Sequence, residues 1–338
     1  MEIVTADIGG SHARFALADV EAGQVMRLSE PITLKTFEHA SLQTAWETFR
    51  RQVGRPLPRD AAIAVACPTA GEMLKLTNNP WIIRPAQIRD RLGIDHLTLI
   101  NDFGAVGHAV FRVGDEYLRH LCGPDTPLPK EGVISIVGPG SGLGMAHVLR
   151  RNGRDHVVEC EGGHIDFAPT DVIEDSILAR LRRRFRRVSV ERIVSGPGLA
   201  NIYETVAAIE GKAVHIGNDL ELWTAALSGT DSLAVVALDR FCLILGSVAG
   251  DIALVHGAKG VVIGGGLSLR IADVLTRSGF AGRFAAKGRF ERVLSSIPVR
   301  IPSRDSLARQ LPSPKRIIDE QNRRDHDTSS SNPGAYDR

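Results

Sequence analysis

The chain has 338 residues, of which 43% are hydrophobic and 24% are charged, and its formal net charge is +2 at pH 7. This length exceeds what one hydrophobic core usually supports, so we expect two domains or one large α/β unit. The composition is ordinary for a globular protein and gives no support to nucleic acid as a partner.

Three features bear on the compartment of the protein. The N-terminus lacks a basic segment followed by an apolar core, so no signal peptide is predicted. No uninterrupted apolar stretch of about 18 residues occurs, which argues against a membrane span. Cys67, Cys122, Cys160 and Cys242 lie far apart without a CxxC pair, which predicts neither a disulfide framework nor a zinc site. We expect a soluble cytoplasmic protein that does not bind membranes.

The first third of the chain alternates between strand and helix patterns. Two β-branched runs at residues 3–8 and 14–20 flank a Gly-Gly turn and predict a β-hairpin, to which residues 24–34 could add a third strand. The segments that follow predict a helix over residues 41–53, a strand over 61–68, a helix over 85–93 and a strand over 96–102. We therefore place a smaller α/β domain at residues 1–109.

The architecture then starts again. After a stretch at residues 110–130 that we interpret as loop, residues 132–149 repeat the order of strand, glycine-rich turn and strand. Residues 171–257 are mostly helical in pattern, and a strand over residues 260–266 precedes a further helix. We place a second, larger α/β domain at residues 110–301.

The basic run RLRRRFRR occupies residues 180–187. It resembles a nucleic-acid patch in composition, but it continues the pattern of an amphipathic helix. We interpret it as a solvated helix face.

The tip of the first hairpin carries an unusual combination of residues. Gly9 and Gly10 have no Cβ atoms, so their backbone N–H groups can approach an anion, and the Ser11 hydroxyl adds a donor. An acid beside a phosphate site requires a cation between the two, which makes Asp7 a candidate for holding Mg²⁺ through water. The alternative is a plain hairpin with a glycine turn. The candidate nucleotide-binding residues here are Ala6, Asp7, Ile8, Gly9, Gly10 and Ser11.

Two further glycine clusters would supply backbone donors to a nucleotide. GPGSGLG at residues 138–144 lies between two predicted strands, and IGGGLS at 263–268 ends a strand and opens a helix. Neither is a Walker A sequence. The candidate residues are Gly138, Gly140, Ser141, Gly142, Gly264, Gly265 and Gly266.

Eight motifs together carry a resemblance to a known family. In chain order they are DIGGSHAR, ACPTAG, TNNPW, INDFGAV, GPGSGLG, EGGHIDFAP, VSVERIVSGPGL and IGGGL. Their order and spacing over about residues 1–301 resemble those of bacterial glucokinases of the hexokinase type, in the sugar kinase/actin/Hsp70 superfamily. The resemblance implies an α/β, two-domain, actin-like ATPase (ribonuclease H-like) fold with an inter-domain cleft. It also implies phosphorylation of glucose by ATP with Mg²⁺, and a homodimer.

The resemblance also assigns roles to polar residues. It makes Asp102 the catalytic base, whereas without it the Asn-Asp pair would be interpreted as a helix cap. Carboxylates and amides that accept hydrogen bonds from sugar hydroxyls discriminate against sugars that lack them. The implied glucose-binding residues are Asn101, Asp102, Glu161, His164 and Glu191, with Asn78 as a further candidate.

The family pattern stops after residue 301. Residues 302–338 are polar, charged and rich in Ser and Pro, which predicts a largely disordered tail. We consider two origins, a frameshift near residue 302 and a lineage-specific tail. Two functional alternatives also stay open, namely a kinase for fructose or mannose and a non-catalytic sugar-sensing regulator on the same fold.

Overall fold

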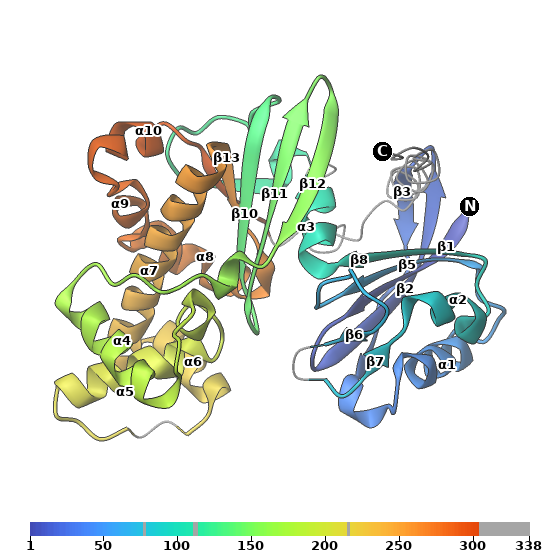
Figure 1. The fold of residues 1–338 in the computed structure, drawn as a ribbon, viewed down its shortest axis with the longest axis horizontal. Coiled ribbons are helices and arrows are strands. Elements are labelled where there is room, and N and C mark those ends of the chain that lie inside the picture. Colours follow the sequence, from blue (N-terminus) through green and yellow to red (C-terminus); the bar gives the residue numbers. More distant parts are fainter. Residues whose placement is uncertain (77–78, 111–113, 215–216, 304–338) are drawn as a thin grey trace, which may run out of the picture. The chain divides into compact units, whose positions relative to one another are not determined.

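The computed structural model describes residues 1–76, 79–110, 114–214 and 217–303. They divide into two compact units, with the boundary between residues 112 and 113. Each unit is built on its own mixed β-sheet, and helices pack against that sheet (Figure 1). The predicted tail and Asn78 lie outside the described residues, apart from residues 302 and 303.

The first unit contains a six-stranded sheet in the order β3-β2-β1-β5-β8, with β4 also paired to β2. Its strands are β1 (Glu2–Ile8), β2 (His12–Glu21), β3 (Gln24–Leu28), β4 (Ile32–Lys35), β5 (Asp60–Val65) and β8 (His96–Asn101), and a separate pair is formed by β6 (Leu74–Lys75) and β7 (Ile82–Ile83). The predicted hairpin is confirmed, since β1 and β2 are antiparallel, while β5 and β8 continue the sheet in parallel.

The third strand that we predicted over residues 24–34 is two strands instead of one. β3 pairs with the second half of β2, and β4 pairs with its first half. The break falls at Ser29, Glu30 and Pro31. Proline has no N–H to donate to a strand ladder and has a fixed φ, which favours a break at this point.

Three helices cover the first sheet, namely α1 (Leu42–Val53), α2 (Pro85–Leu92) and α3 (Asp102–Val110). Ser41 begins α1 with a capping box, and Gly54 ends it in the left-handed conformation. The α1 aromatic rings of Trp46 and Phe49 pack on Phe15 of β2, with centroids 6.2 and 5.2 Å away. α3 packs on β5 and β8 through a separate apolar cluster.

The second unit contains six strands in the order β12-β11-β10-β13-β14-β9. They are β9 (Leu118–Cys122), β10 (Gly132–Pro139), β11 (Leu143–Arg151), β12 (Arg154–Cys160), β13 (Ala258–Ile263) and β14 (Val299–Pro302). The predicted repeat of strand, glycine-rich turn and strand is confirmed as β10 and β11. The interpretation of residues 110–130 as loop is wrong because it contains β9, and β12 was not predicted.

β9 exists because a distant strand stabilises it. It pairs antiparallel with β14, which lies more than a hundred residues later in the chain. Arg300 of β14 is 8% exposed, and its guanidinium donates to the carbonyl oxygens of Leu118 and Thr126. It also forms an ion pair with Asp125 at 3.0 Å. The local sequence of β9 contains no sign of this partner.

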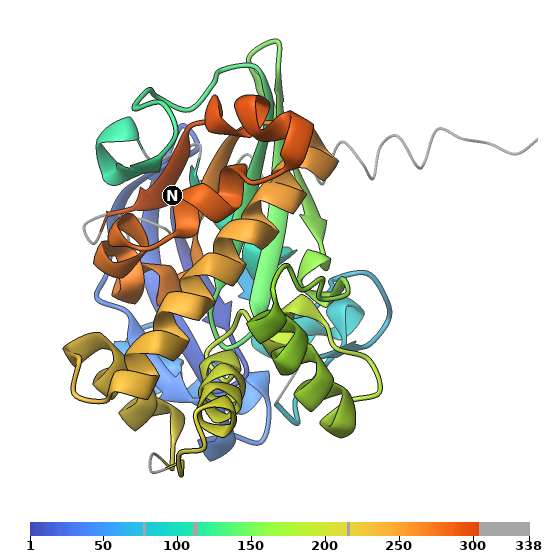
Figure 2. The same ribbon diagram turned by 90° about the vertical axis from the view of Figure 1, so that its left-hand side faces the viewer.

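Seven helices complete the described part of the second unit, and most of residues 171–257 is helical, as predicted. They are α4 (Val172–Arg184), α5 (Gly198–Ile209), α6 (Asp219–Ser228), α7 (Ser232–His256), α8 (Gly265–Arg277), α9 (Phe280–Ala285) and α10 (Glu291–Ser295). α7 is apolar and long enough to cross a membrane, with a mean hydropathy of 1.9 in its most apolar window. That window is 72% buried, and α7 packs along β10 and β13 (Figure 2). It therefore has the character of a core helix.

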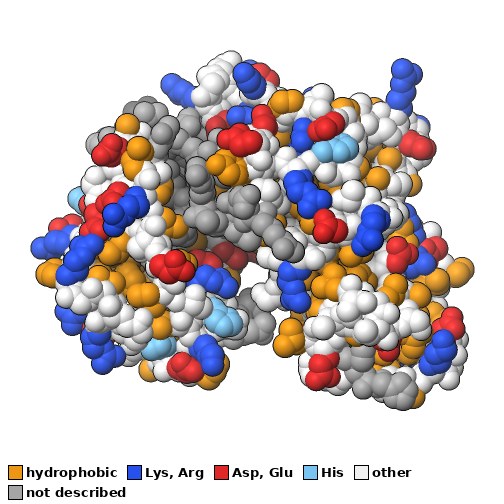
Figure 3. Space-filling model, turned by 180° about the vertical axis from the view of Figure 1, so that it is seen from behind, with side chains coloured by type: hydrophobic (Ala, Val, Ile, Leu, Met, Phe, Trp, Pro, Cys, Tyr) orange, Lys and Arg blue, Asp and Glu red, His pale blue; other side chains and the backbone are white. Residues whose placement is uncertain are grey.

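The arginines of the basic run are half-buried or exposed, as the interpretation of a solvated face predicts, but α4 ends at Arg184, so residues 185–187 lie beyond the helix. Arg182 and Arg183 at the end of α4 are exposed, while Arg180 and Arg184 form ion pairs with Glu204 of α5. On the face of the molecule drawn in Figure 3, basic and acidic side chains are interspersed.

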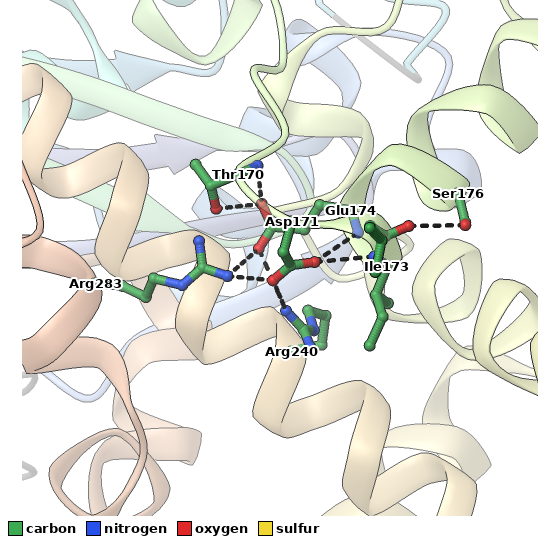
Figure 4. Close-up of polar contacts among 8 residues, drawn as sticks. Thr170, Asp171, Ile173, Glu174, Ser176, Arg240 and Arg283 are labelled. Atoms are coloured by element: carbon green, nitrogen blue, oxygen red, sulfur yellow. Dashed lines mark hydrogen bonds and ion pairs between the residues drawn. The ribbon is translucent and has the colours of Figure 1, made fainter.

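A partly buried ion-pair network joins three helices of the second unit (Figure 4). Asp171, the N-cap of α4, and Glu174 share the guanidinium groups of Arg240 from α7 and Arg283 from α9. The Glu174 side chain is 1% exposed, and its second oxygen accepts the N–H and the hydroxyl of Thr170, each at 2.8 Å. Burial alone would raise the pKa of Asp171, but the Glu174 N–H and the two arginine charges lower it below its usual value.

We expect Glu174→Ala to destabilise the protein by about 3 kcal/mol or more, because it removes the buried carboxylate shared by the partly buried Arg240 and Arg283 and both Thr170 contacts. The matched control is Asp175→Ala, which removes an exposed acid from the same helical turn and should change the unfolding free energy by less than about 1 kcal/mol. The measurement is urea unfolding followed by circular dichroism. Similar midpoints for the two variants would show that the network contributes little.

Candidate active site

The first candidate phosphate loop is a tight hairpin tip in the first unit. The Gly9 N–H donates to the His12 carbonyl oxygen at 2.9 Å and closes the turn between β1 and β2. Thr36, which follows β4, holds the tip from outside, because its N–H donates to the Ser11 oxygen at 3.0 Å and its hydroxyl to the Gly10 oxygen at 2.8 Å. Asp7 pairs with Arg14 across the hairpin at 2.9 Å, and its side chain is 36% exposed. The carboxylate is therefore accessible beside the loop.

The parallel strands place this loop and the Asn-Asp pair on one sheet edge. Ile8 at the end of β1 is in register with Val65 of β5, and Val65 is in register with Asn101 of β8. Because neighbouring strands lie about 4.8 Å apart, β1 and β8 are separated by roughly 10 Å at this edge. Ligands of open α/β sheets bind at the carboxyl ends of their strands. The sequence showed the hairpin tip and the Asn-Asp pair only as separate motifs, without their alignment at one sheet edge.

Asn101 and Asp102 have different roles at the junction of β8 and α3. The Asn101 side chain is buried, and its oxygen accepts the N–H groups of Phe103 at 2.8 Å and Gly104 at 3.2 Å. Its amide donates to the Cys67 carbonyl oxygen at 3.2 Å. Asn101 thus caps α3, as the alternative interpretation held. Asp102 is half-buried at the first position of α3, and its Oδ1 accepts the Phe103 N–H at 2.9 Å, which orients the carboxylate.

The second glycine loop joins β10 to β11 in the second unit. The Gly140 N–H donates to the Gly142 oxygen at 2.8 Å, and the Gly196 N–H donates to the Gly140 oxygen at 2.7 Å. The loop is therefore fixed on both sides of Ser141, which is itself exposed.

The third glycine cluster packs directly on the second. The Gly264 N–H donates to the Val137 oxygen at 2.9 Å, and α8 begins at the next residue. Gly265 has φ +78°, and a Cβ atom there would lie 2.6 Å from the Pro139 oxygen. Only glycine fits this approach. The N-terminal N–H groups of α8 consequently lie beside the second loop, an arrangement that suits an anion.

Glu161 is the N-cap of a short 3-10 turn directly after β12, η3 (Gly162–His164), and His164 is its last residue. Both side chains are exposed, and the His164 N–H donates to the Glu161 carbonyl oxygen at 3.0 Å. Gly163 between them is buried, and a Cβ atom on it would lie 2.1 Å from the Leu143 oxygen at the start of β11. Because Gly162 and Gly163 have no Cβ atoms, the turn packs closely against β11 next to the second loop.

Glu191 belongs to a neighbouring 3-10 turn, η4 (Val190–Arg192), which the Val190 N–H ties to the Ile165 oxygen at 2.9 Å. The Glu191 carboxylate accepts the Leu143 N–H at 2.9 Å. The second unit thus brings Glu161, His164 and Glu191 together at the loop between β10 and β11. This direct link between Glu191 and the glycine loop was not predicted from the sequence.

Sequence reasoning also missed a residue of the TNNPW motif. Asn78, the residue that we selected there, lies outside the described residues. Its neighbour Asn79 is buried, donates to the Gly9 oxygen at 3.4 Å and accepts the Trp81 N–H at 2.9 Å. The motif thus supports the first candidate phosphate loop through a hydrogen bond to its backbone.

Two α/β units, each with a glycine-rich hairpin, define the class of actin-like sugar kinases. The crystal structure of glucokinase from an Antarctic psychrotroph is similar with a TM-score of 0.76 and 31% sequence identity. The similarity covers 91% of this chain and 96% of that one.

The sequence comparisons narrow the class to a family. The glucokinase family model matches residues 4–308. The glucokinase of Zymomonas mobilis is 63% identical over 301 residues, which cover 89% of this chain and 93% of the relative. That of Caulobacter vibrioides is 42% identical, with 87% of this chain and 89% of the relative covered. The chain belongs to the glucokinase family, as the sequence resemblance indicated.

We expect Gly142→Ala to raise the KM for glucose by about tenfold or more, which corresponds to about 1.4 kcal/mol. The added Cβ would lie 2.4 Å from the Glu191 carboxylate and would displace it from Leu143. The matched control is Gly140→Ala in the same loop, where a Cβ atom meets nothing within 4 Å. Steady-state kinetics and a melting curve for both variants provide the measurement, and an equal effect on the glucose KM would contradict a specific role of the Glu191 contact.

Proposed function

We propose that the chain transfers the γ-phosphoryl group of ATP to the 6-hydroxyl of D-glucose, which gives glucose 6-phosphate and ADP. The observation that carries this proposal is the glucokinase family match over residues 4–308, which includes every candidate site residue. The reaction is an entry step of glycolysis. A homodimer in the cytoplasm is part of the same proposal, on the strength of the family resemblance.

Asp102 is the proposed catalytic base. A phosphoryl acceptor must lose a proton from its hydroxyl, and a positioned carboxylate can accept it. Two features support this role. The Phe103 N–H orients the Asp102 carboxylate, and the Asn101 cap fixes the backbone on which it stands. The adjacent first phosphate loop lies on the same sheet edge.

Glucose recognition is assigned to polar side chains that can form hydrogen bonds with sugar hydroxyls. The proposed set is Asn78, Asn101, Asp102, Glu161, His164 and Glu191. A carboxylate that is satisfied by a sugar hydroxyl penalises a sugar without that hydroxyl, since the acceptor then loses its partner. Glu191 is already held by the Leu143 N–H, so one part of its orientation is fixed before sugar binds.

The glycine-rich segments are the proposed ATP site. The loop residues Gly9, Gly10, Ser11, Gly138, Gly140, Ser141 and Gly142 would surround the phosphates, with the Gly9 and Gly140 N–H groups closing the two turns rather than donating to phosphate. Gly264, Gly265 and Gly266 at the start of α8 would contact the rest of the nucleotide. Phosphoryl transfer depends mainly on such positioning and charge stabilisation. Mg²⁺ usually retains several waters and binds few protein carboxylates. The accessible carboxylate of Asp7 would suit it, and the ion would neutralise phosphate charge.

The proposal is tested with a coupled assay across donors and hexoses. With ATP, ADP and polyphosphate as donors and glucose, fructose and mannose as acceptors, we expect the highest kcat/KM for ATP with glucose. A higher value for fructose or mannose would assign the chain to another hexose. Sugar binding without turnover of any pair would favour the regulator.

We expect Asp102→Asn to lower kcat by about 10²–10⁴ while the KM for glucose and the melting temperature change little, because the amide keeps the shape but does not accept a proton. Asp90→Asn, at an exposed position of α2, is the matched control and should keep full activity. Activity of Asp102→Asn within a few-fold of the parent would remove Asp102 from its proposed role.

A further inference from the structure

Three side chains that no glucokinase step uses meet in the second unit. His147 of β11, Cys160 of β12 and His256 at the end of α7 place their nitrogen and sulfur atoms within 4.8 Å of one another. All three residues are half-buried. We call them the His-Cys-His cluster.

The sheet register explains how the cluster forms. Cys160 lies opposite Met145 of β11, and His147 is two residues further along that strand, so the two side chains share one face of the sheet. Ser135 of β10 lies opposite His147 on the same face. α7 packs along this part of the sheet and brings its last residue, His256, to the group. His147 and Cys160 come from two adjacent strands, whereas His256 lies almost a hundred residues after Cys160, which explains why local Cys and His spacing gave no sign of the cluster.

Each imidazole has a nitrogen suited to a metal ion. His256 Nδ1 lies 2.8 Å from the Ser135 hydroxyl, and when Nδ1 donates to that oxygen, Nε2 presents its lone pair. His147 Nδ1 is buried and has no hydrogen-bond partner among the described residues. An unsatisfied buried nitrogen destabilises the fold, and a metal ion would supply its partner. The two ring centroids are 4.3 Å apart.

The protonation states agree with this geometry. Burial lowers the pKa of both imidazoles, and the charge of His147 lowers the pKa of His256 further, which favours the neutral form of each ring. Neutral imidazole is the form that binds a metal. Burial raises the pKa of the Cys160 thiol, which makes it a poor nucleophile, but a bound metal would displace its proton.

We propose that the His-Cys-His cluster binds a zinc ion, with a water molecule at the fourth position. Two imidazole nitrogens and one thiolate favour zinc over magnesium or calcium, which prefer oxygen ligands. With bonds of about 2.0–2.3 Å, tetrahedral ligands lie roughly 3.3–3.7 Å apart, so the side chains need to move by only about 1 Å. The ion would join α7 to β11 and β12. Since Cys160 directly precedes Glu161, the ion would also fix the strand end before the proposed sugar site.

The test uses the full chain, stripped with a chelator and titrated with Co²⁺ as a spectroscopic probe of the zinc site. We expect one Co²⁺ per chain, with a thiolate-to-cobalt charge-transfer band and the strong visible bands of a tetrahedral ion, and Zn²⁺ should displace it. Cys160→Ser should abolish the charge-transfer band. Ser135→Ala, which removes only the support of His256, should weaken Zn²⁺ binding by about 10–100-fold.

Two controls and a second readout complete the experiment. His156→Gln removes an exposed histidine from β12, and Cys122→Ser removes a buried thiol elsewhere in the unit, so both should retain the Co²⁺ spectrum. Zn²⁺ should raise the melting temperature of the parent but not that of His256→Gln. His256→Gln also tests the proposal if Cys160→Ser folds poorly. A charge-transfer band that persists in Cys160→Ser, or the absence of a 1:1 complex in the parent, would overturn the proposal.

Discussion

The second unit depends on backbone contacts that leave no room for a Cβ atom. A Cβ atom added to Gly163 would lie 2.1 Å from the Leu143 oxygen, one on Gly142 would lie 2.4 Å from the Glu191 carboxylate, and one on Gly265 would lie 2.6 Å from the Pro139 oxygen. Through these contacts, two 3-10 turns and the start of α8 gather around the loop between β10 and β11. The glycines therefore allow close packing of the elements that carry the polar side chains, in addition to the role in phosphate binding that we propose for several of them.

In the first unit, strand register and polar side chains position the candidate site residues. Parallel pairing of β1, β5 and β8 aligns the strand ends, so the hairpin tip and the junction of β8 with α3 share one edge. The surrounding contacts from Thr36, Asn79 and Asn101 are all hydrogen bonds to backbone groups. Strand register determines the separation of the candidate base from the first phosphate loop, and polar side chains fix the turns themselves.

The sequence predicted those elements whose signals are local. The first hairpin, α1, and the repeat of β10 and β11 each carry their own hydrophobic period, and both hairpins also carry a glycine-rich turn within a few residues. β9 and the His-Cys-His cluster were missed for the same physical reason, since each depends on partners distant in the chain. The ordered motifs also identified the family, whereas the contact of Glu191 with Leu143 became visible only in three dimensions.

The pairing of β9 with β14 has a consequence for how the chain folds during its synthesis. β9 is the first strand of the second unit in the chain, and its only strand partner among the described residues ends at Pro302. While a ribosome is still translating the helices between them, Leu118, Leu121 and Cys122 have no strand on which to pack, and the loop that must close is long. Such non-local pairing slows folding. The sheet of the second unit is therefore completed late in synthesis, after nearly the whole unit has emerged from the ribosome.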